Sequence, residues 1–348
     1  MSTNERPGVY TAYEVTSALT GTGSGKAVGV AACAASGTAL EPTALTSYAE
    51  AAEAFGADCG LTRLIKVLIQ NGAPKIVAVP VLVGEGVPTT AQYQAAFSVL
   101  MAESTVGYMI CGSGDAAVHL ALEAAIEEAD SELCKYRIGI VEGDGTASAL
   151  VAAAAVLDCE RMTLVTPAFV SGAPGSVAAA VAGAAAGSAD PALPLNGAKL
   201  EGLSGLVSCF TDGEINALVQ GGVTPVENVG GEVSVVRAVT TRTTTGGVPD
   251  ATWRELSTIL IVDDVIPAVR DALRAKFSRT KNTAQTRGAI RTQVVIELEK
   301  KIAAEIIDSY GNVTVRADDS DPTVCSVGFE FTVSHGLNKI SLVAYITV

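Results

Sequence analysis

Residues 136–167, "YRIGIVEGDGTASALVAAAAVLDCERMTLVTP", contain the pattern that decides the fold class. Two short apolar runs, "RIGIV" and "MTLVT", flank an alanine-rich stretch of helical length, and glycines lie where the first run turns into it. A strand, a helix and a second strand in this order form a βαβ unit, whose two strands lie parallel in one sheet.

The same alternation extends in both directions from this stretch, from Lys26 to about Ser188. We expect further strands at 26–35, 75–83 and 106–112, and further helices at 47–56, 60–73, 90–103, 115–130 and 176–187. Strands that alternate with helices of this length predict a largely parallel sheet covered by helices.

The alternation of strands and alanine-rich helices ends at a segment rich in Pro, Gly and Asn, "SADPALPLNGA" (188–198). The second half of the chain has a different pattern. It predicts a helix and a strand pair at 214–245, then two long helices, the first of which Pro267 kinks or restarts. Alternating apolar residues predict strands at 327–334 and 339–348, which could form an ordinary hairpin with each other. The fold class expected is therefore α/β in the first half and α+β in the second.

Composition narrows the possible functions. The chain has 348 residues and a net charge of −14, which disfavours nucleic acid as the main partner. No apolar run reaches the roughly 20 residues of a membrane-spanning helix, and the N-terminus lacks a signal-peptide pattern, so we expect cytosolic folding without membrane insertion. The seven cysteines include no CxxC pair and are expected to be reduced core thiols.

Catalytic and cofactor sites are weakly indicated. The two histidines, His119 and His335, lie far apart in the chain, so we expect no catalytic residues and no metal site. "GTGSGKA" (21–27) lacks the spacing and the Ser/Thr of a phosphate-binding loop, so no cofactor is expected there. Gly143 and Gly145 follow a strand, which keeps a cytosolic nucleotide-binding α/β enzyme with Asp144 at its site as the alternative.

One segment departs from the acidic character of the chain. Between Pro267 and Thr292 seven Lys/Arg face a single acid, a local charge of +6 that leaves −20 for the rest. Such a segment fits a surface apposed to an acidic partner, although a plain solvated helix face explains it equally well. The basic residues are Arg270, Arg274, Lys276, Arg279, Lys281, Arg287 and Arg291.

Several motifs in order resemble the contractile tail sheath proteins of phages, phage-tail-like bacteriocins and related injection systems. "RPGVY" (6–10) is similar to the N-terminal arm motif of that family, and "YAEAAEAFG" followed by "LIKVLIQNGAPKIVAVPV" resembles its early pattern. "INALVQGGVTPVE", "VVRAVTTRTTT" and "STILIVDDVIPAVRDALRAKFSRTKNTAQTRGAIRTQV" match its C-terminal domain in order. Residues 100–190 are only loosely similar to the family.

The resemblance implies four parts: an N-terminal arm (1–20), an outer α/β domain (21–190), a conserved inner sheath domain (191–337) and a C-terminal arm strand (338–348). In similar sheaths both arms add to the sheets of neighbouring subunits, because strand addition supplies main-chain hydrogen bonds between copies. The residues implied in these contacts between subunits are Gly8, Val9, Tyr10, Tyr13, Val15, Ile340, Leu342, Ala344, Ile346 and Val348.

The resemblance also implies a non-enzymatic structural subunit that polymerises helically, as stacked hexameric rings, around an inner tube and contracts to drive that tube through a target envelope. The seven basic residues would face an acidic tube, with Lys276, Arg279, Lys281 and Arg287 the first candidates. Further implied partners are baseplate and tail terminator proteins. Assembly would take place in the bacterial cytoplasm, and the mature subunit would lie in a virion tail or a released phage-tail-like particle.

Overall fold

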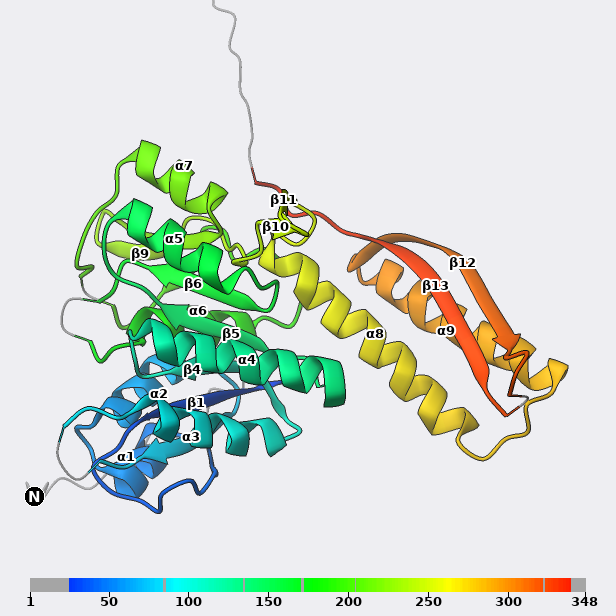
Figure 1. Cartoon of the computed structure of the whole chain (residues 1–348), viewed down its shortest axis with the longest axis horizontal. Helices are drawn as coiled ribbons and strands as arrows, with labels where there is room; N and C mark the ends of the chain where they lie inside the picture. Colours follow the sequence, from blue (N-terminus) through cyan, green and yellow to red (C-terminus); the bar gives the residue numbers. More distant parts are fainter. Residues whose placement is uncertain are drawn as a thin grey trace, which may run out of the picture.

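The described part of the chain consists of a body built on a nine-stranded sheet and a narrower projecting unit (Figure 1). The computed structural model describes residues 25–83, 86–133, 135–169, 172–203, 205–321 and 323–338. The body holds the sheet and the helices that cover it, up to about residue 241, and the projecting unit holds the two long helices and the two strands that follow residue 255.

The strands of the body are short and buried, as expected for a sheet covered on both faces. They are β1 (Ala27–Cys33), β2 (Thr43–Leu45), β3 (Ile76–Val81), β4 (Val106–Cys111), β5 (Ile138–Glu142), β6 (Met162–Thr166), β7 (Lys199–Leu200), β8 (Val223–Val229) and β9 (Glu232–Val235). Their order is β2-β3-β1-β4-β5-β6-β8-β9-β7. The run from β3 to β8 is parallel, and β2, β9 and β7 pair antiparallel at its two ends.

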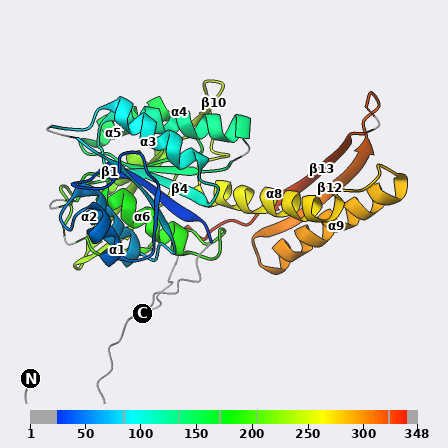
Figure 2. The same cartoon turned by 90° about the horizontal axis from the view of Figure 1, so that it is seen from below.

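Helices form one layer on each face of this sheet (Figure 2). They are α1 (Tyr48–Phe55), α2 (Gly60–Gln70), α3 (Thr90–Ala102), α4 (Ala116–Leu133), α5 (Ala147–Leu157), α6 (Ser176–Gly187) and α7 (Asp212–Gln220). The helices α1, α2 and α6 bury their apolar residues in one cluster with the sheet, while α3, α4, α5 and α7 bury theirs in a second cluster on the opposite face. The predicted α/β architecture, with its largely parallel sheet, is confirmed.

The sheet continues past residue 190, where the sequence predicts the outer domain to end. That residue lies in the loop after α6, and β8 then returns to pair with β6. The predicted strand pair of the second half is the antiparallel hairpin of β8 and β9, which extends the sheet of the first half. The division into four domains stays a prediction.

The projecting unit consists of α8 (Leu256–Phe277), α9 (Ala284–Ala303), β12 (Ile307–Ala317) and β13 (Cys325–Val333), and a small hairpin of β10 (Thr244–Thr245) and β11 (Val248–Pro249) precedes it. Its own core joins α8, α9 and the inner face of the β12–β13 ladder. The predicted alternation holds in β13, where Phe329 and Phe331 pack inward and Glu330 is exposed. The strand β12 was not predicted, and β13 pairs with it; residues 339–348 lie outside the described residues.

Helix α8 belongs to both parts of the molecule. Leu256, Ile259 and Leu260 complete the body core, while Ile261 and Val265 lie in the core of the projecting unit. Helix α8 does not restart at Pro267, because it runs as one helix with the proline inside it, and the predicted kink stays a prediction. Packing on two cores outweighs the hydrogen bond that the proline nitrogen cannot donate.

Candidate functional site

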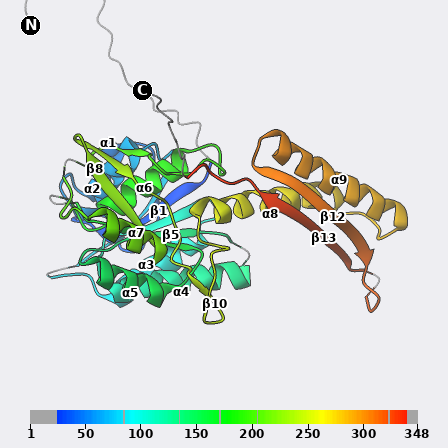
Figure 3. The same cartoon turned by 90° about the horizontal axis from the view of Figure 1, so that it is seen from above.

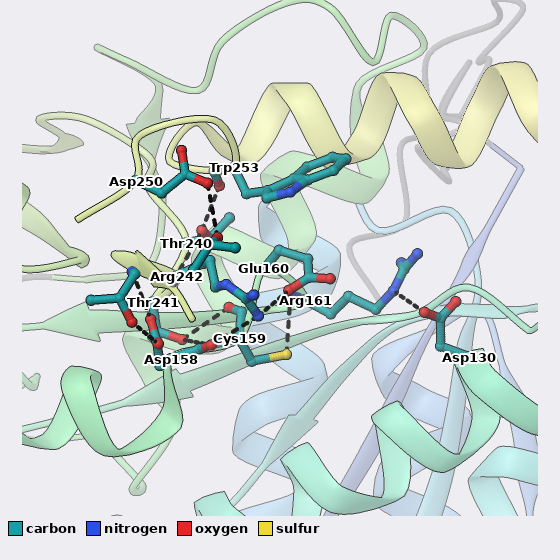
Figure 4. A network of polar contacts seen from close by, with 12 residues as sticks. Asp130, Asp158, Cys159, Glu160, Arg161, Thr240, Thr241, Arg242, Asp250 and Trp253 are labelled. Carbon is teal, nitrogen blue, oxygen red and sulfur yellow. Dashed lines mark hydrogen bonds and ion pairs between the residues drawn. The ribbon is translucent and has the colours of Figure 1, made fainter. Parts of the chain in front are cut away.

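The base of the projecting unit is fixed by a buried ionic contact between Arg161 and Asp263. Nη1 of Arg161, just before β6, lies 3.0 and 2.9 Å from the two carboxylate oxygens of Asp263 on α8. Its Nε lies 3.2 Å from Oδ2 of Asp130 on α4 (Figure 4). The guanidinium therefore joins a sheet strand, a covering helix and the projecting helix.

Burial sets the energetics of this contact. Arg161 is 5% exposed and Asp263 2% exposed, so both charges have lost most of their water. Burial opposes the charged form of Arg161, but the carboxylates of Asp263 and Asp130 outweigh it and raise the pKa of the guanidinium. Burial raises the pKa of Asp263, against the attraction of Arg161. A pair of this kind adds little net stability, yet either charge alone would be strongly unfavourable.

A second set of polar contacts fixes the segment that leads into α8. Asp158, in the left-handed region at the end of α5, accepts hydrogen bonds at Oδ1 from the backbone N–H groups of Thr243 (2.8 Å) and Thr244 (3.1 Å). Burial favours a higher pKa for Asp158, but the hydrogen bonds from Thr244 and Thr243 outweigh it and lower the pKa. The ionised carboxylate of Asp158 therefore holds the backbone of Thr243 and Thr244 in place.

The residues on either side of these hydrogen bonds make further polar contacts between the same two segments. The Thr241 hydroxyl donates to the Cys159 carbonyl at 3.0 Å, and Arg242 pairs with Glu160 at 3.2 Å (Figure 4). The α5–β6 loop therefore contacts the projecting unit twice: Asp158 binds the segment before α8, and Arg161 binds α8 itself. These two contacts fix the direction in which α8 leaves the body.

The alternative nucleotide site has the wrong charge. A cavity of about 290 Å³ at Gly143 is lined by the carboxylates of Glu142 and Asp144, and no Lys or Arg is among the described residues that line it. Glu142, buried at the end of β5, accepts hydrogen bonds from the backbone N–H groups of Gly175 (3.2 Å) and Val177 (2.6 Å) at the start of α6. Phosphates bind cations and free helix N-termini, so this cavity does not favour them.

Other candidate groups fit structural roles. His119 lies on α4, 2.9 Å through Nε2 from the Ser113 carbonyl oxygen, and burial lowers its pKa. Glu123, Glu127 and Cys159 are the residues, in the part of the chain described, whose ligand atoms lie close enough to share a metal ion. Burial and the neighbouring Glu127 raise the pKa of Glu123 to about 7. An acidic pair beside a buried thiol does not by itself indicate a bound ion.

The seven basic residues of 267–292 fall into different settings. Arg270 and Arg274 line the angle between α8 and the body. Lys276, Arg287 and Arg291 contact their own unit, at Gln293, Asn282 and the Val313 carbonyl. Arg279 and Lys281 are exposed near the α8–α9 loop. Contact of the seven basic residues with a tube stays a prediction.

The predicted arm residues, 8–15 and 340–348, lie outside the described residues. The sequence reasoning missed Arg161, Asp263 and Asp158. One signal was present for Asp263: it lies four residues after Ile259 in an apolar helical stripe, where a charge requires a buried partner.

Two family models match most of the chain. The phage tail sheath protein central domain matches residues 86–241, and the phage tail sheath C-terminal domain matches residues 248–347. No curated protein sequence matches. Within the described helices, none has the length and apolar character needed to span a bilayer.

Solved structures share the fold at low identity. A sheath tail protein from Desulfitobacterium hafniense aligns with a TM-score of 0.72 and 12% identity, over 94% of this chain and 100% of its own. A chain of the anti-feeding prophage helical sheath in the contracted state aligns with a TM-score of 0.72 and 14% identity, over 99% and 100%. A sheath tail protein from Listeria innocua gives 0.71 and 12%, over 90% and 96%. From the two family models, with this fold in agreement, the chain belongs to the phage tail sheath protein family and is a structural subunit of a contractile tail sheath.

Proposed function

We propose that the chain polymerises helically around an inner tube through its two terminal segments, each of which adds as a strand to the β12–β13 ladder of a neighbouring copy. The observation that carries this is the pairing of the ladder: in the described part of the chain, β12 and β13 pair only with each other. Each strand therefore has one outer edge with unpaired main-chain groups, which natural proteins cover or block.

The ladder is suited to receive strands. It is long, spanning 11 and 9 residues, and its inner face packs on α9, so its edges stand out from a fixed support. The two open edges equal in number the two terminal segments for which the sequence predicts strands, Val9–Val15 and Ile340–Val348. Each main-chain hydrogen bond gained contributes about 1 kcal/mol net and needs no particular side chain, so the connection would survive rotation of the subunits.

Removal of residues 1–20 tests strand donation. We expect the shortened chain to keep its thermal unfolding midpoint, because a donated strand would be ordered by the neighbouring copy, and the buried clusters of the described part of the chain are built from residues 27–333. We expect few or no sheaths by electron microscopy when the inner tube is present. A matched control is the full chain with Glu5→Gln, which changes one residue ahead of the strand segment and leaves that segment intact. Sheaths of normal length from the shortened chain would contradict the proposal.

The basic residues nearest the α8–α9 loop are proposed to face the tube. Arg279 and Lys281 are exposed at the outer end of the projecting unit, which supports an electrostatic contact with an acidic surface. Such exposed pairs are weak, about 0.2–1 kcal/mol each, which suits a contact that must break on contraction.

Charge reversal at Arg279 and Lys281 should therefore weaken assembly on the tube. The loss should be larger at low ionic strength, because salt screens exposed charges over about 10 Å at 0.1 M. Sheath length against salt concentration measures this, with Arg63→Glu on α2 of the body as the control. An unchanged salt dependence in the double variant would assign the tube contact to other residues.

The proposal includes no catalytic role. It places assembly in the bacterial cytoplasm and the mature subunit in a tail or tail-like particle, with baseplate and terminator proteins at the two ends of the sheath.

A further inference from the structure

Helix α8 leaves the body at an angle (Figure 1), and the residues on the two sides of this angle line a basic cleft. It encloses about 510 Å³ between the amino ends of β4 and β5 and the middle of α8. Its charged lining residues are Lys26, Lys135, Arg137, Arg270, Arg274, Asp263 and Asp271. Five cations against two carboxylates give the cleft a charge of +3 in a chain whose net charge is −14.

Arg137 is the feature of this cleft that points to a ligand. Its side chain is 1% exposed, and Nη2 donates to the carbonyls of Met101 (3.1 Å) and Glu103 (2.6 Å). Its Nε has no hydrogen-bond partner, and no carboxylate among the described residues forms an ion pair with the group. Burial lowers the pKa of Arg137. A buried guanidinium without a counter-ion is costly, and an anion in the cleft would offset that cost.

Each of the two carboxylates of the cleft already pairs with an arginine, Asp263 with Arg161 outside the lining and Asp271 with Arg270 within it. Both oxygens of Asp263 accept from Arg161, and Oδ1 of Asp271 lies 3.7 Å from Nε of Arg270. Lys135 donates to the carbonyls of Met101 and Ala102 at 3.0 and 3.4 Å, and no ion pair of its side chain with another described residue is found. The positive charge of Lys135, Arg137 and Arg274 is therefore available to a ligand.

The chain carries a segment of matching charge. The acidic turn, residues 318–321, joins β12 to β13 at the outer end of the projecting unit and holds Asp318, Asp319 and Asp321 (Figure 3). No Lys or Arg occurs from 317 to 325. Asp318 Oδ1 accepts from the backbone N–H groups of Ser320 (2.8 Å) and Asp321 (3.0 Å), which fixes the turn. Hydrogen bonds from Ser320 lower the pKa of Asp318, and those from Thr323 lower the pKa of Asp321.

We propose that the basic cleft of one copy binds the acidic turn of a second copy. A charge of −3 on an ordered, exposed turn complements +3 in the cleft, and the turn is presented by the part of the molecule that stands farthest from the body (Figure 3). The contact would fix the angle between neighbouring projecting units, since charge complementarity sets register more than affinity. This inference rests on the proposed helical self-assembly.

A charge exchange tests the contact in the full chain with the inner tube. Arg274→Glu in the cleft and Asp319→Lys in the turn are exposed positions, and no hydrogen bond or ion pair of either side chain is among those described. Each single variant should raise the subunit concentration for half-maximal sheath formation about fivefold or more, and the double variant should return to within about twofold of the wild type. Thermal unfolding midpoints close to the wild type confirm that both singles fold.

Matched variants separate this contact from a general charge effect. Arg316→Glu, an exposed reversal on β12, should not be rescued by Asp319→Lys, and Glu53→Lys on α1 should not rescue Arg274→Glu. If the wild type forms sheaths while both singles assemble normally, or if the double variant shows no rescue, the cleft does not bind the turn and the proposed function stands. If the wild type forms no sheaths with its tube, the proposed function itself fails.

Discussion

Replacement of Asp263 by alanine is expected to lower the free energy of unfolding by about 3–5 kcal/mol, because it leaves the buried Arg161 guanidinium without its main counter-ion. Arg161 donates to both oxygens of Asp263, and among its described partners it would keep the carboxylate of Asp130, at 3.2 Å, and the ring of Tyr136. Urea unfolding at pH 7 measures the loss. The single tryptophan, Trp253, reports on this junction, because it packs against the body core just before α8.

A double replacement distinguishes loss of the pair from loss of packing. Arg161→Met with Asp263→Leu removes both buried charges and keeps apolar volume, and we expect it to recover much of the stability lost by Asp263→Ala. The double variant should nevertheless assemble less regularly, since it lacks the directional contact that orients α8. A single variant as stable as the wild type would show that water reaches Arg161 and that the junction is not fixed by this pair.

The second large effect is expected at Gly183 on α6. A Cβ at this position would lie 2.8 Å from the Leu68 carbonyl oxygen and 2.8 Å from the Asn71 Cβ, so α2 and α6 can approach closely only because residue 183 is glycine. Gly183→Ala should therefore destabilise the body by about 1–3 kcal/mol, as overpacking does, despite the better helix propensity of alanine.

Gly288 provides the matched control, because it also lies inside a helix, α9, but outside its own helical turn no described atom lies within 4 Å of its Cβ position. Gly288→Ala should stabilise the protein by up to about 1 kcal/mol, since only the propensity term changes. The two variants carry the same chemical change and should shift the thermal unfolding midpoint in opposite directions. Shifts of the same sign would mean that the α2–α6 contact tolerates an added methyl group.

Local pattern in the sequence was sufficient for the α/β body. The apolar runs of β1, β3, β4, β5 and β6 are short, continuous and separated by alanine-rich helices, so each element is specified by its own residues. The family resemblance, carried by motifs at both ends and in the second half, was confirmed by the two domain models. Strand β12 was not predicted, because glycine and polar residues interrupt its alternation of apolar side chains at "DSYGNVTV" (308–315).

The sequence by itself determined the helices and the parallel strands of the body, their βαβ order and the excess of positive charge in 267–292. Only the tertiary structure decided that β8 returns to the sheet beside β6, that Arg161 meets Asp263 across 102 residues, and that Lys135 and Arg137 share a cleft with Arg274. The physical reason is that secondary structure follows from residues a few positions apart, whereas a buried charge is satisfied by whichever partner the packing of α8 against the body brings within hydrogen-bond distance.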